Sequence, residues 1–477
     1  MSAAVPETAS ELSFPVAPGA PAPPRIKNRQ ELLDHGMSAL RGDVLRIAEA
    51  GIAACDAERA TLAAVQVAGD RLRVADTEYP LSARTRIIVV GSGKASVPIA
   101  RALERRLGER IQGSAVVARD GAEERAGRIE VIVSDHPLPT ERSLDAARRL
   151  LALAEAAGED DIVFACFTGG SSALTSMPPH GVTIEEKRRL HELLLSSGMG
   201  IVEVNVVRKH VSLFKGGRLG RAVAPAALVN LTISDVAGDP LDAITDPTVA
   251  DSSSADDAIA ILRGYGLWEE VPPSVRLHLQ GDGASCPALD GLRIQTVVLA
   301  NGESACRAMT LEATAAGLRS VVLSTSLEGE ARELGSMVAN LARESCVRGA
   351  PFEPPVVLLG CGGEATVTLG RSPAFGEGGP NQEAALAAAR VVDGSPIAAA
   401  FLDTDGSDGG TERAGAVIDG LTVARAGELG VDLRTAVLEH RAKQAFESLG
   451  DGVLTGPTGT NVNDLFVVAA GDGRSER

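Results

Sequence analysis

The segment Ile87-Ile-Val-Val-Gly-Ser-Gly-Lys-Ala-Ser96 joins an apolar strand to a small-residue turn and the start of an amphipathic helix. Strand-like runs at 130–133, 162–167 and 227–233 also precede polar or glycine-rich turns. Strands that alternate with helical patterns are typical of a parallel sheet with helices on both faces. The sequence therefore predicts an α/β fold with a Rossmann-like, doubly wound parallel sheet.

The 477 residues are enough for two or three domains. Residues 1–26 are rich in Ala and Pro, and we expect a disordered arm there. A polar stretch at 280–291 precedes a second alternating series of strands and helices. We therefore expect a Rossmann-like domain at 27–290 and a second α/β domain at 291–477.

The composition restricts the partners of the protein. The chain has 63 Asp and Glu residues against 46 Lys and Arg, a net charge of -17, which argues against a nucleic acid partner. The six cysteines form no CxxC pair and are expected to be reduced, mostly buried thiols. No basic-apolar leader and no apolar run of roughly twenty residues is present, so we expect a cytoplasmic protein without a membrane partner. The oligomeric state is not determined, and a homodimer is left open.

The turn after the first strand is a candidate phosphate site. Gly91 and Gly93 let the backbone approach an anion at the helix start, and Lys94 adds a positive charge. Ser96 stands where a dinucleotide fingerprint needs a third glycine or alanine, and the spacing does not fit a Walker A loop. The alternative is a tight structural turn with a solvated lysine.

A second turn of this kind lies at 164–173, where a strand leads into two glycines and two serines. Gly169 and Gly170 permit close backbone approach, and Ser171 and Ser172 supply hydroxyls. The alternative is a close helix–sheet contact that requires glycine. Ligands of open parallel sheets bind beyond the carboxyl ends of the strands, so two such turns together favour an anion site.

Basic residues concentrate at 205–218. Arg208, Lys209, Lys215 and Arg218 fall within this short segment of an otherwise acidic chain. Clustered basic side chains bind phosphate or carboxylate groups. The alternative is a solvated helix face.

Acidic and glycine-rich loops supply the remaining candidates. Asp235 and Asp239 follow the strand-like run at 227–233, where they would hold Mg²⁺ or accept a proton from a hydroxyl. Capping and turn roles are the alternative. The spacing of Asp403, Asp405 and Asp408 does not match an EF-hand, which leaves magnesium open. Loops with hydroxyls, amides or acids lie at 359–366, 378–383, 403–409 and 455–464.

Together these motifs resemble the glycerate 2-kinases whose C-terminal half is called the MOFRL domain, over nearly the whole chain after the arm. The most specific matches lie at 205–219, 233–239 and 455–465. The resemblance implies an ATP- and Mg²⁺-dependent kinase that converts D-glycerate to 2-phosphoglycerate, with ATP and the small hydroxy acid meeting in a cleft between two domains. It also implies catalytic roles for Lys94 and Asp235 and metal binding by Asp235 and Asp239.

The sequence departs from the family pattern in four motif cores. Pro380 replaces the arginine of the family's Gly-Gly-Arg-Asn-Gln-Glu, and the motifs at 169–172, 361–364 and 403–406 each differ by one residue. Arg413 is the nearest candidate to replace the lost charge, and Arg371 is a second. Besides the catalytic residues, the binding candidates are Gly91, Gly93, Gly169, Gly170, Ser171, Ser172, Asn205, Arg208, Lys209, Lys215, Glu364, Asn381, Glu383, Asp405, Thr458, Asn461, Asn463 and Asp464.

Two other functions compete with the kinase. The first is a hydroxypyruvate reductase, which the turn at Gly91–Ser96 superficially suggests. The second is a ligand-binding relative that lost catalysis together with the arginine. A reductase changes nicotinamide absorbance with hydroxypyruvate, whereas a kinase converts ATP to ADP when an acceptor is present.

Overall fold

The computed structural model describes residues 24–119, 123–234, 241–369 and 375–472. These residues form two compact units, the first from 57–234 and 241–299 and the second from 24–56 and 300–472. This division differs from the expected boundary at 290. Residues 27–56 join the second unit because the long helix α2 (Ser38–Ala54) packs on its sheet, and β10 (Ile294–Ala300) extends the sheet of the first unit.

The first unit contains the predicted doubly wound sheet. The strands lie in the order β10-β9-β8-β4-β5-β7-β6, and the five from β9 to β7 are parallel. The chain order of those five reverses between β4 and β8, which is where sheets of this type bind ligands. Besides β10, the strands are β4 (Ile87–Ser92), β5 (Ala115–Ala118), β6 (Arg125–Ala126), β7 (Ile129–Val133), β8 (Ile162–Phe167) and β9 (Ala227–Ile233).

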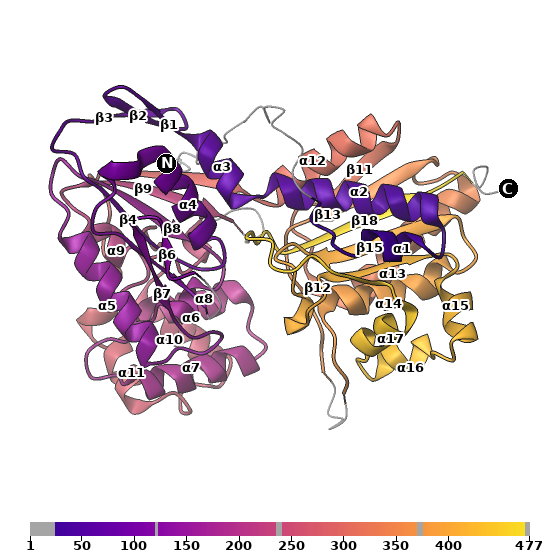
Figure 1. The fold of residues 1–477 in the computed structure, drawn as a ribbon. Coiled ribbons are helices and arrows are strands. Elements are labelled where there is room, and N and C mark those ends of the chain that lie inside the picture. The colour runs from indigo at the N-terminus through magenta and orange to yellow at the C-terminus, as the bar shows by residue number, and fades with distance from the viewer. Residues whose placement is uncertain (1–23, 120–122, 235–240, 370–374, 473–477) are drawn as a thin grey trace, which may run out of the picture. The chain divides into compact units, whose positions relative to one another are not determined.

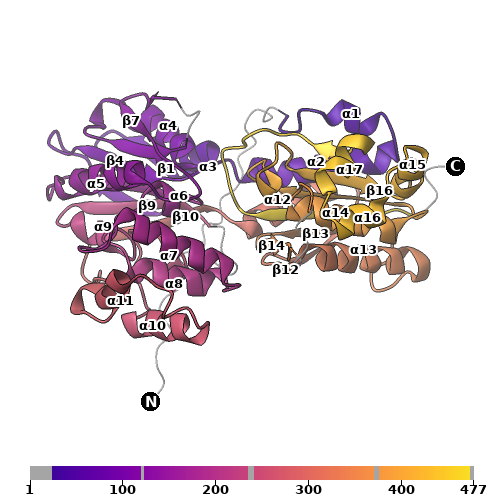
Figure 2. The same cartoon turned by 90° about the horizontal axis from the view of Figure 1, so that it is seen from below.

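Helices cover both faces of this sheet (Figures 1 and 2). Ile88 and Val90 of β4 pack into one core with α5 and α9, while α4 packs on β4, β5 and β8. A small antiparallel sheet, β1-β2-β3, follows α3. These elements are α3 (Ala57–Ala64), α4 (Ser96–Leu107), α5 (Glu141–Glu155), α9 (Arg218–Ala222), β1 (Val65–Ala68), β2 (Arg71–Val74) and β3 (Thr77–Pro80).

A separate helical group completes the first unit. Leu190, Val207, Leu262 and Val275 share one core, so the helices that carry them pack together (Figure 2). The helices are α7 (Ile184–Ser196), α8 (Ile201–His210), α10 (Ala255–Gly264) and α11 (Pro273–Leu279), and the short α6 (Ser171–Leu174) precedes them.

The second unit is built on a mixed sheet. Only β11 and β13 pair in parallel; the other neighbours in the order β11-β13-β18-β15-β16-β17 are antiparallel. The strands are β11 (Arg319–Ser324), β13 (Val356–Cys361), β15 (Ile397–Asp403), β16 (Gly415–Asp419), β17 (Gly452–Val453) and β18 (Asp464–Ala470). A separate parallel pair consists of β12 (Gly329–Glu330) and β14 (Ala365–Thr366).

Helices cover this sheet as well, with α2 along β15 and β18 (Figure 1). Phe401, Phe466 and Leu386 are buried in the core that α13, α14, α16 and α17 share with the sheet. The remaining helices are α1 (Arg29–Leu33), α12 (Gly302–Ala315), α13 (Ala331–Arg348), α14 (Pro380–Val392), α15 (Thr422–Glu428), α16 (Leu433–Leu438) and α17 (Ala442–Leu449), with 3₁₀ turns at Gly108–Arg110, Leu241–Ala243, Asp282–Ala284 and Asp408–Gly410.

Two composition-based predictions can be compared with the described residues. All six cysteines are free, and Cys55, Cys166, Cys306 and Cys361 are buried, which confirms the prediction of mostly buried thiols. Within the described ranges, no helix has the length and apolar character needed to cross a membrane.

Candidate active site

The two glycine-rich turns of the first unit lie side by side where the strand order reverses. The backbone N–H of Lys94 donates to the Gly169 oxygen at 3.0 Å, and the N–H of Ala95 donates to Thr168 Oγ1 at 3.1 Å. Gly93 has φ +119°, and a Cβ there would lie 2.5 Å from the Thr168 backbone oxygen. Glycine at 93 is therefore required for the two turns to bond.

Lys94 and the second turn meet a histidine that sequence reasoning missed. A Cβ built on Gly170 would lie 3.4 Å from His136 Nε2 and 3.9 Å from Lys94 Cγ. His136 follows β7, and both His136 and Lys94 are exposed. The position of His136 after a parallel strand was the signal that could have identified it. Ser171 and Ser172 begin α6, and the buried Ser172 Oγ has no hydrogen-bond partner among the described residues.

Two of the predicted basic residues are committed to structural partners. Lys209 Nζ forms an ion pair with Asp251 Oδ1 at 2.5 Å and also donates to the Asp242 backbone oxygen. Arg218 donates to Cys286 Sγ at 3.1 Å and to nearby backbone oxygens. The two side chains thus tie the end of α8 and the segment after it to the rest of the unit.

Arg208 and Lys215 differ from Lys209, because no carboxylate in the described ranges forms an ion pair with either. Arg208 is buried, donates to Asn205 Oδ1 at 3.3 Å, and has Nη2 3.1 Å from His191 Nε2. Lys215 Nζ donates to the Thr175 oxygen at 2.9 Å. Burial and then the charge of Arg208 lower the pKa of Lys215 to about 7, although Asp246 opposes the shift.

The acidic candidates Asp235 and Asp239 lie outside the described residues, as does Arg371. Asn205, which is buried on α8, donates through Nδ2 to the Ala243 oxygen at 3.1 Å. Asn205 therefore anchors the chain just after the segment that carries the two aspartates.

In the second unit, a buried carboxylate holds the start of α14. Asp408 accepts hydrogen bonds from the backbone N–H and the side-chain amide of both Asn381 and Gln382, at 2.8–3.2 Å. Burial raises the pKa of Asp408 to about 6 in spite of these donors. A Cβ on Gly379 would lie 2.3 Å from Asp408 Cγ, so glycine is needed there. Pro380 occupies the first position of the helix, which proline suits because it lacks an N–H.

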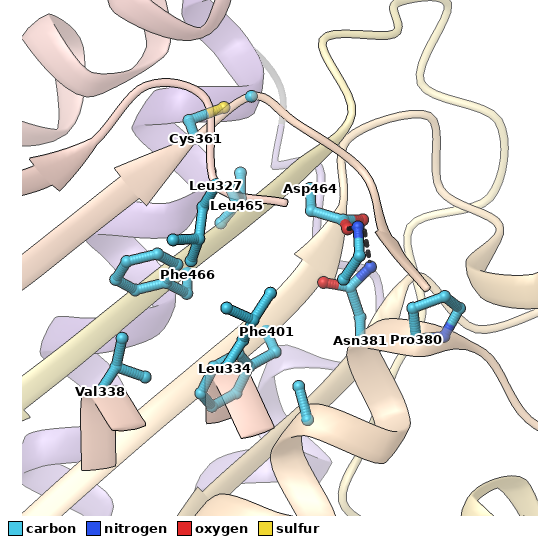
Figure 3. A pocket seen from close by; sticks show the side chains of 13 residues that line it. Leu327, Leu334, Val338, Cys361, Pro380, Asn381, Phe401, Asp464, Leu465 and Phe466 are labelled. Atoms are coloured by element: carbon cyan, nitrogen blue, oxygen red, sulfur yellow. Dashed lines mark hydrogen bonds between the residues drawn. The ribbon is translucent and has the colours of Figure 1, made fainter. Parts of the chain in front are cut away.

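Asn381 also contacts Asp464, at the edge of a small pocket (Figure 3). The Asn381 Nδ2 donates to Asp464 Oδ1 at 2.5 Å, and the Ala365 N–H donates to Oδ2 at 2.8 Å. The pocket has a volume of about 30 Å³ and includes Pro380 and Phe401 in its lining. Burial raises the pKa of Asp464 to about 7, and the negative charges of Asp408 and Glu364 add to this effect. Glu364, one of these carboxylates, is exposed.

The loops around 403–408 and 455–464 are interlocked. Thr458 donates to the Thr404 oxygen at 2.6 Å, and Thr404 donates to the Asn463 oxygen at 2.8 Å. The Asp405 carboxylate accepts from the Ser407 N–H at 2.8 Å, and Asn461 is buried beside this network. The structure therefore brings these predicted loops together.

Glu383 and Arg413 make contacts other than those of the Asn381–Asp464 pair. The buried Glu383 has Oε2 at 2.8 Å from His440 Nδ1, and its Oε1 has no hydrogen-bond partner among the described residues. Arg413 lies over β17, since a Cβ on Gly452 would be 3.3–3.5 Å from its Cγ, Cδ and Nε atoms. Arg413 is also linked to Asp408, whose N–H donates to the Arg413 oxygen.

Among the described residues, His210, Asp251 and Cys286 have side-chain geometry compatible with a metal ion. Lys209 and Arg218 already donate to Asp251 and Cys286. Mg²⁺ prefers oxygen ligands, so this group does not suit it.

Comparison with known proteins agrees with this architecture. Residues 43–280 match a domain of unknown function, DUF4147, and residues 356–464 match the MOFRL family. "Glycerate 2-kinase" of Pyrococcus horikoshii is 39% identical over 429 residues, covering 89% of this chain and 96% of that protein. A protein of Agrobacterium vitis with a provisional hydroxypyruvate reductase name is 40% identical over 411 residues, covering 86% of this chain and 92% of that protein.

A solved structure matches both units. The crystal structure of glycerate kinase from Thermotoga maritima has a TM-score of 0.75 and 31% identity, covering 93% of this chain and 99% of that chain. The fold and the matches define an α/β phosphotransferase with an alcohol acceptor. Within that class, the chain belongs to the glycerate 2-kinase family.

Proposed function

We propose that this protein transfers the γ-phosphoryl group of ATP to the 2-hydroxyl of D-glycerate. The observation that carries the proposal is the pair of hydrogen-bonded turns at the reversal point of the first sheet, with Lys94 exposed beside them. The names of the similar proteins support the same activity. In the reaction, the hydroxyl oxygen bonds to the γ-phosphorus, the bond to the ADP oxygen breaks, and the hydroxyl proton is released.

The first unit supplies the groups that such a transfer needs. Phosphoryl transfer depends on positioning and on neutralising charge rather than on covalent catalysis. Lys94 provides a positive charge for the transferring phosphate, and the turns at Gly91–Gly93 and Gly169–Ser172 bring backbone N–H groups close to it. Asn205, Arg208, Lys209 and Lys215 remain assigned to binding, with Lys209 acting through its ion pair to Asp251.

The second unit supplies polar groups whose roles remain proposals. The loops that carry them are fixed by the contacts of Asp408 and Thr404, so their side chains are held in defined positions. We assign nucleotide or substrate binding to Glu364, Asn381, Glu383, Asp405, Thr458, Asn461, Asn463 and Asp464. Arg413 is proposed to supply the positive charge that Pro380 lacks.

Magnesium enters as the usual companion of ATP, whose phosphates it neutralises. Asp408 does not fit as a ligand, because four protein donors occupy its two oxygens. We therefore keep Asp235 and Asp239 as the proposed metal ligands. Asp235→Asn and Asp239→Asn should each raise the magnesium concentration that gives half-maximal activity. Unchanged activation curves in both variants would indicate that these residues act as caps and not as metal ligands.

An ATP-consumption screen over three- to five-carbon hydroxy acids tests the proposal. ADP should form with D-glycerate, and the product should be 2-phosphoglycerate. A hydroxypyruvate-dependent change in nicotinamide absorbance without ADP formation would instead identify a reductase. Cytoplasmic location stays a prediction, and a homodimer stays open.

A further inference from the structure

Three buried basic side chains of the first unit form no ion pair with any described residue. Lys187, Arg208 and Lys215 are each less than a tenth exposed, and no carboxylate in the described ranges forms an ion pair with any of them. The contrast with the adjacent Lys209 is direct, because Lys209 has its ion pair with Asp251. A buried charge without a partner is costly and is retained where it serves a function.

The two lysines are held in place by backbone groups. Lys187 Nζ donates to the oxygens of Arg208 and Val211 at the end of α8, and Lys215 Nζ donates to Thr175 at the end of α6. These carbonyls orient the two amino groups. Burial, followed by the charges of Lys215 and Arg208, lowers the pKa of Lys187 well below its ordinary value, so a bound anion would favour its protonated form. Asp246 is the carboxylate whose charge acts on Lys215, and its oxygens already accept from Thr248 and Asn230.

Arg208 has donor capacity left. Among the described residues, its guanidinium forms hydrogen bonds with two side chains, those of Asn205 and His191, and its buried Nε has no partner. Because arginine can only donate, His191 must accept through an unprotonated Nε2. Burial and the neighbouring cations lower the pKa of His191 to about 3, which agrees with a neutral ring.

The cluster lies close to the two turns. His191 is within range of the charge of His136, and the Cβ position of Gly170 is 3.4 Å from His136 Nε2. Lys215 contacts the end of α6, which begins at Ser171. The cations thus lie beside the carboxyl ends of β7 and β8.

We propose that Lys187, Arg208 and Lys215 form a buried oxyanion site, with His191 orienting Arg208. The two sources of such an anion are the carboxylate of the acceptor and a phosphate of the nucleotide. The two candidate anions are taken from the proposed function. The existence of the site does not depend on that function.

Arg208→Met is the decisive variant, because Arg208 supports no backbone group. Calorimetry on the full-length protein should measure binding of D-glycerate alone, ADP alone and inorganic sulfate alone. We expect Arg208→Met to weaken sulfate and one of the two organic probes at least tenfold, and Arg208→Lys to weaken them less. Loss confined to D-glycerate identifies the carboxylate, and loss confined to ADP identifies the phosphate.

Arg189→Met, at an exposed cation on the same helix as Lys187, is the matched control and should bind all probes as the parent does. The melting temperature of Arg208→Met should not fall below that of this control, because the substitution removes no ion pair with a described residue. The site would be contradicted if Arg208→Met bound every probe within twofold of the parent affinity, whether or not its melting temperature fell. It would also be contradicted if the parent bound none of the probes. If Arg208→Met loses sulfate binding but the parent does not turn over glycerate, the anion site is supported and only the proposed reaction is contradicted.

Discussion

Lys94 is the residue on which the proposed chemistry depends most. Its backbone N–H is bonded to Gly169, but its side chain is exposed, so the fold should not require it. Lys94→Ala should lower kcat/KM on the order of a hundredfold, the usual effect of removing one charge-stabilising donor. The melting temperature should stay at the parent value. Turnover at the parent rate would remove Lys94 from the mechanism.

The arginine replaced by Pro380 gives a second prediction at this scale. Pro380 starts α14 and lines the pocket beside Asn381, so no cationic side chain stands at that position. If Arg413 supplies the charge instead, Arg413→Ala should abolish transfer. Pro380→Arg should not by itself raise activity on glycerate, because Ser171 and Asp403 also differ from the family pattern. A gain on glycerate of a hundredfold, about 2.7 kcal/mol of barrier, would contradict this account.

Lys215 gives the pH dependence. Its pKa in the folded protein is about 7, whereas the ordinary value is 10.5. The unfolded chain therefore binds more protons between these values, so this group makes stability rise with pH from about 7 to 10.5. An anion needs the protonated amine, and its affinity should fall over the same range. Lys215→Met should remove this slope from sulfate titrations between pH 6 and about 9.

At the scale of elements, the start of α14 depends on the contact between Gly379 and Asp408. Gly379→Ala would place a methyl group against the buried carboxylate and should cost roughly 1–3 kcal/mol of unfolding free energy. Gly427→Ala is the control, because nothing lies within 4 Å of its Cβ position on α15. That variant should be neutral or slightly stabilising. Equal denaturation midpoints for the two variants would contradict the packing argument.

The sequence allowed the strands and turns of the first unit to be predicted, because each apolar run ends at a polar or glycine-rich segment. It did not reveal Lys187 or His191, since a charge on a helix is usually solvated and only tertiary packing buries it. Asp408 was expected in a loop, but its four hydrogen bonds come from residues 26 and 27 positions earlier. The mixed pairing of the second sheet likewise depends on contacts distant in sequence.

At the scale of the whole molecule, the largest difference from expectation is the path of residues 27–56. The fully buried Arg41 on α2 contacts Asp419 and Asp451, and Arg425 and His35 also pair with Asp451. This network joins the start of the described chain to β16 and β17. No local sequence pattern indicates such a long-range connection.

Arg41→Met should destabilise the second unit by about 3–5 kcal/mol, because two buried carboxylates would lose a partner. Arg46→Met on the same helix is the control, since its pairs with Asp43 and Glu312 are partly exposed. It should cost at most about 1 kcal/mol. Chemical denaturation measures both, and similar midpoints would show that the network contributes little.

Identification of the product tests the central claim most directly. The full-length protein should be incubated with ATP, Mg²⁺ and D-glycerate, and the phosphorylated acid analysed by phosphorus NMR. The account predicts stoichiometric ADP and 2-phosphoglycerate, with both formed on the order of a hundredfold more slowly by Lys94→Ala. Formation of 3-phosphoglycerate, or no ATP-dependent product from D-glycerate, would contradict it.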